Sequence, residues 1–155
     1  MDEYQRITEM IHEVDEAYFI GRKVVQEIIA IEDELGSAGN WGLVDLFGGG
    51  FFTTMIKHNH LDAAKRRFQS LQNILQDYGR ELSDVNIDTN FDLQIDNLTT
   101  FADYFFDGFI FDGLVLNKIN QYKKQIKKIK DQVYLVQKSL YETKKVLVAK
   151  QQELN

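Results

Sequence analysis

Two long stretches of this chain, one at each end, repeat apolar side chains at alternating intervals of three and four residues. This spacing lines one side of a helix and is the signature of a heptad repeat. The first stretch places Tyr4, Ile7, Ile11, Val14, Tyr18, Gly21, Val25, Ile28, Glu32 and Leu35 on this spacing. The last one places Ile119, Tyr122, Ile126, Ile129, Val133, Val136, Leu140, Thr143, Leu147, Lys150 and Leu154 on it. Such stripes must be buried against a partner, so the pattern predicts long packed helices.

The charges of the two stretches are opposite. Residues 1–35 carry ten acidic and three basic side chains, whereas 113–155 carry ten lysines against three acidic side chains. We therefore predict that helices over 1–35 and 113–155 pair within one chain as an antiparallel coiled coil. The chain has no proline, which suits long uninterrupted helices. The expected fold is mainly α, in a single domain over residues 1–155.

Residues 36–112 are predicted to form a small central head. The two glycines in GSAGN at 36–40 are expected to end the first helix there in a loop. A third apolar stripe predicts a helix over 60–82, with Asn59 as its N-cap. His58 and His60 would then lie on different helices.

The head is also expected to contain a minor β element. Apolar and polar side chains alternate over 85–96, as they do along a half-buried strand. The pattern fits a hairpin within the chain or an edge strand that pairs with a second copy.

Two segments of the head carry unusual residues. Residues 41–58 show the pattern W-G-x-x-D-x-x-G-G-G-x-x-x-T-x-x-K-H, and 101–108 reads FADYFFDG. Both resemble signature segments of an uncharacterised family of small bacterial helical proteins. The resemblance implies no known activity, but it implies that the two segments meet in the fold.

If these segments meet, their polar side chains form a candidate binding cluster. It consists of Trp41, Asp45, Gly48, Gly49, Gly50, Thr54, Lys57, His58, Asp103 and Asp107. Carboxylates with a histidine suit a divalent metal or acid–base chemistry, which makes His58, Asp103 and Asp107 the metal candidates. The structural alternative is an ion-pair network that fixes how the segments pack, and we favour it with Lys57 as the cation. The three glycines are read as a close backbone crossing rather than an anion site.

Two functional classes remain open. The favoured one is a coiled-coil interaction or scaffold protein, with a protein partner or a second copy of the chain. The alternative is a small enzyme or ligand-binding protein that uses the head cluster. No cofactor is expected other than the possible divalent metal at the head cluster. No nucleic-acid partner is expected either, because the acidic helices would compete with phosphate for the lysines. The acidic N-terminus and the aspartates in the apolar run 101–116 favour a cytoplasmic protein without a membrane span.

Overall fold

The computed structural model describes residues 1–46, 51–89, 103 and 118–155, with side chains at 37–62, 64 and 86–89 excepted. These residues form three long helices: α1 (Glu3–Leu46), α2 (Phe51–Thr89) and α4 (Ile119–Glu153). No strand occurs in the described part of the chain, so the prediction of a mainly α fold is confirmed. Over the same residues, no helix carries an apolar stretch long enough to cross a membrane.

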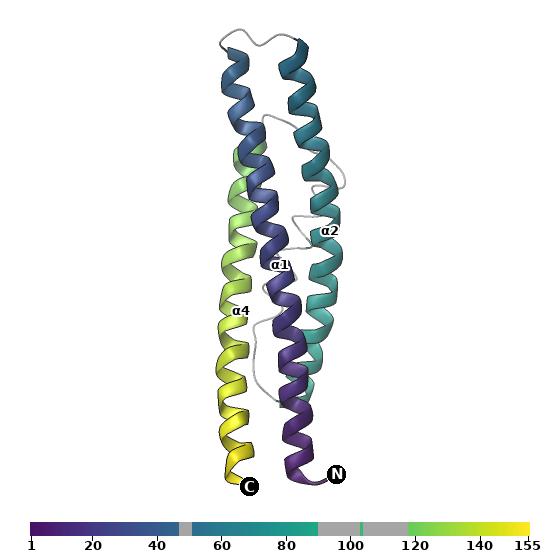
Figure 1. The fold of residues 1–155 in the computed structure, drawn as a ribbon, viewed down its shortest axis with the longest axis vertical. Helices are drawn as coiled ribbons and strands as arrows, with labels where there is room; N and C mark the ends of the chain where they lie inside the picture. The colour runs from purple at the N-terminus through teal and green to yellow at the C-terminus, as the bar shows by residue number, and fades with distance from the viewer. Residues whose placement is uncertain (47–50, 90–102, 104–117) are drawn as a thin grey trace.

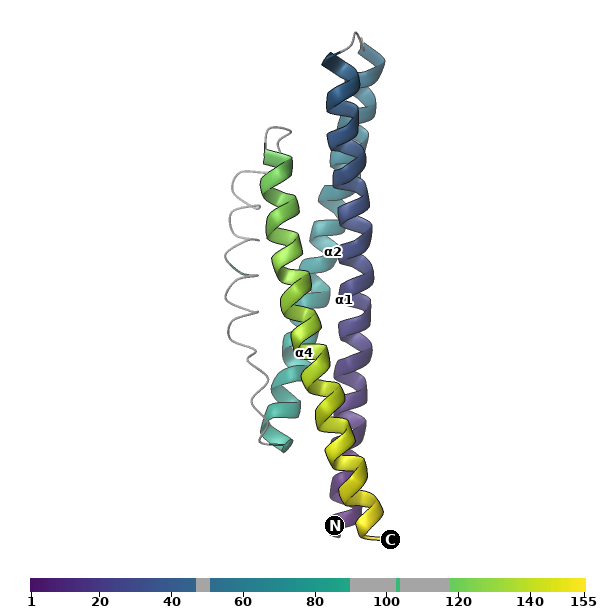
Figure 2. The ribbon, with the colours of Figure 1, turned by 90° about the vertical axis from the view of Figure 1, so that its left-hand side faces the viewer.

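The helices lie side by side in an elongated bundle (Figure 1). α1 runs in one direction, α2 and α4 run in the other, and both chain ends lie at the same end of the bundle. Figure 2 shows that α4 stays beside α1 down to that end.

Polar contacts fix the register between α1 and α4. Lys144 Nζ contacts Asp15 Oδ1 at 2.7 Å, and Lys130 Nζ donates to both carboxylate oxygens of Glu32 at 2.7 and 2.9 Å. Gln151 Nε2 donates to Thr8 Oγ1 at 2.8 Å. Residue numbers fall along α4 as they rise along α1, in agreement with the opposite directions of the two helices.

The first turn of α1 is stabilised by a reciprocal cap. The backbone N–H of Gln5 donates to Asp2 Oδ1 at 2.7 Å, and the backbone N–H of Asp2 donates to Gln5 Oε1 at 3.2 Å. This is a capping-box arrangement, in which two otherwise unpaired backbone donors are satisfied by side chains three residues apart.

One continuous apolar core joins the three helices. In α4 the buried positions follow the predicted stripe from Ile119 to Leu147, whereas Lys150 and Leu154 are exposed. In α2 the described core residues are Phe68, Leu71, Leu75, Tyr78, Leu82 and Val85.

In α1 only half of the predicted stripe is fully buried. The line from Ile7 through Val14 to Leu35 is buried as expected. The second buried line is Ala17, Val24 and Ile31, not Tyr18, Val25 and Glu32. The predicted second line was wrong because α1 packs against two helices at once, which widens its buried arc and moves it toward α2.

The centre of the bundle contains a polar junction between all three helices. Gln137 of α4 is buried; its Oε1 accepts a hydrogen bond from the hydroxyl of Tyr78 in α2 at 2.7 Å. Its Nε2 donates to the backbone oxygen of Tyr18 in α1 at 3.0 Å. The side chain fits there because position 21 is glycine: a Cβ at Gly21 would overlap the Gln137 amide.

Two predicted helix boundaries differ from the structure. α1 does not stop at Gly36 but continues to Leu46, because a glycine inside a helix costs only about 1 kcal/mol. α2 begins at Phe51 rather than at residue 60, so Asn59 is not an N-cap. A chain without proline has no obligatory break at either place.

The strand prediction was wrong for residues 85–89, which belong to α2. Val85 is fully buried three residues after Leu82 and seven after Tyr78, so it extends the helical stripe. Residues 90–96 lie outside the described part of the chain.

Candidate functional site

The predicted head cluster falls almost entirely outside the described side chains. The backbones of Trp41 and Asp45 belong to the end of α1, and those of Thr54, Lys57 and His58 to the beginning of α2. These two helix ends lie at the same end of the bundle (Figure 1). Their side chains are not among those described, and neither are the three glycines or Asp107.

Asp103 is the one member of the predicted head cluster whose side chain is described, and it is exposed. The predicted contact of Asp103 with Lys57, His58 or a metal involves residues outside the described side chains. One detail is corrected: His58 and His60 both belong to α2, because that helix runs through Asn59 without interruption.

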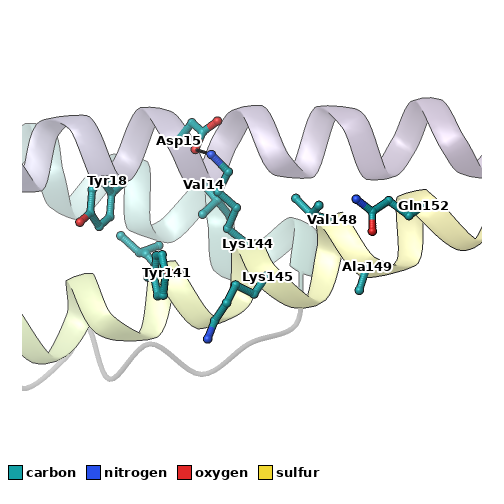
Figure 3. Close-up of a pocket in the computed structure, with 10 residues that line it drawn as sticks. Val14, Asp15, Tyr18, Tyr141, Lys144, Lys145, Val148, Ala149 and Gln152 are labelled. Atoms are coloured by element: carbon teal, nitrogen blue, oxygen red, sulfur yellow. Dashed lines mark hydrogen bonds and ion pairs between the residues drawn. The ribbon is translucent and has the colours of Figure 1, made fainter.

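A different candidate site lies between α1 and α4, near the end that carries both termini. It is a groove of about 610 Å³, on the side of the helix pair away from α2 (Figure 3). Val14 and Leu140 are buried beneath it, and its accessible apolar surface comes from Val148, Tyr18 and Tyr141. Asp15 and Lys144, which pair across the groove at 2.7 Å, join its two sides.

Exposed aromatic side chains lie in the groove and near it along the two helices. The exposed fraction is 37% for Tyr18, 57% for the neighbouring Phe19, and 55% for Tyr141. Tyr134 is also exposed and lies seven residues before Tyr141, so both project from the same side of α4. We call Tyr18, Phe19, Tyr134 and Tyr141 the aromatic face.

Lysines cover part of this aromatic face. The Nζ of Lys23 lies 4.6 Å from the ring centroid of Phe19, and that of Lys145 lies 5.0 Å from the ring centroid of Tyr141. Both distances are within the range of a cation–π interaction. The face therefore combines aromatic rings with positive charge, although the whole chain has a net charge of −6.

The polar junction of the core contacts the backbone of α1 beside the groove. Gln137 binds the backbone oxygen of Tyr18, whose side chain lines the groove, and is itself held by Tyr78. Burial, with a smaller contribution from Tyr18, raises the pKa of the Tyr78 hydroxyl, which therefore stays protonated and donates. The backbone of Tyr18 is thus held by Gln137 of α4, which is held in turn by Tyr78 of α2.

An acidic cluster lies on the other side of α1. Glu13, Glu16 and Glu81 each place a carboxylate oxygen within 4.8 Å of the others. Burial, followed by the charge of Glu16, raises the pKa of Glu81. Exposed carboxylates gather in this way without a metal, so we assign no site here.

The sequence held a signal for the groove that the heptad analysis did not use. Tyr134, Tyr141 and Val148 repeat every seven residues outside the buried stripe of α4. A second apolar line on a helix whose first line is already buried indicates a further contact surface.

Comparisons with protein-family models, with curated proteins and with solved structures give no significant match for this chain.

Proposed function

We propose that this protein is a coiled-coil interaction protein, a helical rod that presents the α1–α4 groove to another protein. The observation that carries the proposal is the groove itself, where apolar side chains of two helices border exposed aromatic rings. A groove between two helices with exposed aromatic rings is a common form of protein-binding surface. Tyrosines are frequent anchors of protein interfaces, because they bury a large ring and keep a polar end.

The rigidity of the bundle supports this proposal. The groove is built on two long helices, whose register is set by Asp15–Lys144, Glu32–Lys130 and Thr8–Gln151. The Gln137 junction adds a buried contact that holds Tyr18 in place. A surface fixed in this way binds without a large ordering cost, which is what a scaffold requires. The cytoplasmic location and the family membership remain predictions.

The proposal is tested by photo-cross-linking in the cells that produce the protein. A benzophenone amino acid replaces Tyr141, which lines the groove, or Leu135, which is 66% exposed on another side of the same helix. We expect a discrete intermolecular adduct from position 141 and none from position 135, with the cross-linked species identified by mass spectrometry. Equal labelling from both positions, or no intermolecular adduct from position 141, would contradict the proposal.

A further inference from the structure

The groove is bordered by basic side chains that point to the chemistry of its occupant. Lys138 and Lys145 are exposed, and their seven-residue spacing places them on one side of α4, beside Tyr141. On α1, Arg22 and Lys23 are exposed in the turn that follows Tyr18. We call these four residues the basic rim.

Few acidic side chains offset the basic rim. Asp15 is paired with Lys144 at 2.7 Å, and Glu142 contacts Lys145 at 3.0 Å. Lys127, which is exposed seven residues before Tyr134, adds one positive charge, and Asp131, exposed one turn after Lys127, offsets it. The surface around the groove is therefore positive in an acidic protein, and charge complementarity favours an anionic occupant.

The shape of the groove favours a helix. Its α4 lining runs from Leu140 to Gln152, which corresponds to a length of about 18 Å, or three turns of an α-helix. Its walls are two helices that run side by side in opposite directions (Figure 3). An amphipathic helix binds such a groove through apolar side chains at intervals of three and four residues.

We propose that the groove binds an amphipathic helix with acidic flanks, presented by a partner protein. This inference rests on the proposed function and names the partner's chemistry. The apolar side of the bound helix contacts Val148 and the rings of Tyr18 and Tyr141, and its acidic flanks face the basic rim. A second copy using the same face would bring two basic rims together, and their repulsion opposes that arrangement.

The test uses a synthetic fluorescein-labelled helix of about 18 residues, long enough to form three turns and its ends. The probe carries leucine at i, i+3, i+4 and i+7 and glutamate on both flanks. One control peptide has lysine in place of every glutamate, and a second has the composition of the probe without the periodicity. Fluorescence anisotropy with the full chain should give saturable binding of the acidic amphipathic probe, weakened by salt, and no comparable binding of either control.

Variants of the protein locate the binding site. Tyr141→Ala and the double variant Lys138→Glu/Lys145→Glu should each weaken binding at least about tenfold, a loss of about 1.4 kcal/mol. Leu135→Glu, on another side of α4, should leave it unchanged. Circular dichroism establishes that each variant is folded. Equal binding of the control peptides, an equal effect of Leu135→Glu, or equally tight binding of a single-stranded DNA oligonucleotide would overturn the inference.

The experiments distinguish a failure of the proposed interaction function from a failure of the proposed acidic helix. If position 141 cross-links to another protein but the acidic probe shows no preference, the docking surface stands and the acidic helix is wrong. If position 141 cross-links to a second copy, the interaction function stands and the occupant is the chain itself. If no intermolecular adduct forms, the interaction function fails whatever the peptides do.

Discussion

Gly21 is the residue on which the central packing depends most directly. A Cβ at this position would overlap the Gln137 side chain, whereas a Cβ at Gly36 would meet nothing within 4 Å. Both glycines lie inside α1, so alanine improves helix propensity equally at the two positions. Comparing alanine substitutions at these two positions therefore separates the effect of helix propensity on stability from the effect of packing.

We predict that Gly21→Ala lowers the free energy of unfolding by about 1–3 kcal/mol through overpacking. Gly36→Ala should raise it by about 0.5–1 kcal/mol. Urea unfolding measures both values. In a Gln137→Ala background the cost of Gly21→Ala should vanish, because the overlapping amide is gone. An unchanged cost in that background would show that the amide is not what restricts position 21.

Tyr78 gives a prediction for the pH dependence of stability. Tyr78→Phe removes the donor to buried Gln137 Oε1 and should cost about 1–3 kcal/mol at neutral pH. Burial raises the pKa of Tyr78 above its ordinary value of about 10, so above that pH the unfolded chain releases the proton first. The difference in free energy of unfolding between the native protein and Tyr78→Phe is therefore fully present below pH 10. Above it, the difference falls by about 1.4 kcal/mol per pH unit.

Urea unfolding of both proteins between pH 8 and 11, taken as a difference, cancels the lysines and the other tyrosines. A difference that stays constant across this range would mean that the Tyr78 hydroxyl titrates in the native state as it does in the unfolded chain.

At the scale of the helices, the contact between Thr8 and Gln151 provides a test of the α1–α4 register. The chain contains no cysteine, so a pair introduced by Thr8→Cys and Gln151→Cys reacts specifically. A short bismaleimide should join the two within one chain, giving a faster band on a denaturing gel. The control pair, Asp33→Cys with Gln151→Cys, places the α1 cysteine about 38 Å further along and should not react internally. Efficient internal linkage of the control pair would exclude the register seen here.

The helices also mark the limit of what the sequence predicts. The α4 stripe was predictable from Ile119 to Leu147, because its positions follow the heptad spacing without a gap and all but Thr143 are apolar. α1 has two further apolar lines, one on each side of the line through Ile7, Val14 and Leu35. Which of the two is buried depends on the helices that pack against α1, and the sequence of α1 alone does not give their positions. The short alternation of apolar and polar residues at 85–96 predicted a strand, but residues 85–89 are helical. Val85 fits a helical stripe equally well.

The candidate site was less predictable than the fold. The head cluster was predicted from three consecutive glycines, the single tryptophan and His58, but unusual residues in a segment give no geometry. The groove is made of tyrosines, lysines and valines, which are ordinary on a helical surface. What makes them a site is the placement of Tyr18 next to Tyr141, and that depends on how α1 and α4 pack.

At the scale of the whole molecule, the bundle is far from spherical. α1 has 44 residues, which corresponds to a length of about 66 Å. We expect small-angle X-ray scattering at low concentration to give a radius of gyration of about 20 Å, against about 15 Å for a compact chain of this size. A value near 15 Å would mean that the helices fold back on themselves in solution.

The contacts between α1 and α2 join residues that are closer in sequence than those joined by the contacts between α1 and α4. This difference implies an order in which the helices assemble. Arg67 of α2 reaches Glu27 of α1 across 40 residues, whereas the α1–α4 contacts bridge 98 to 143 residues. Closing the longer loop costs about 1 kcal/mol more chain entropy, so we expect the α1–α2 hairpin to form first and α4 to dock onto it. A circular permutant that links Asn155 to Met1 and opens the chain between α1 and α2 should reverse this order. The same bundle would then be reached through α4 and α1.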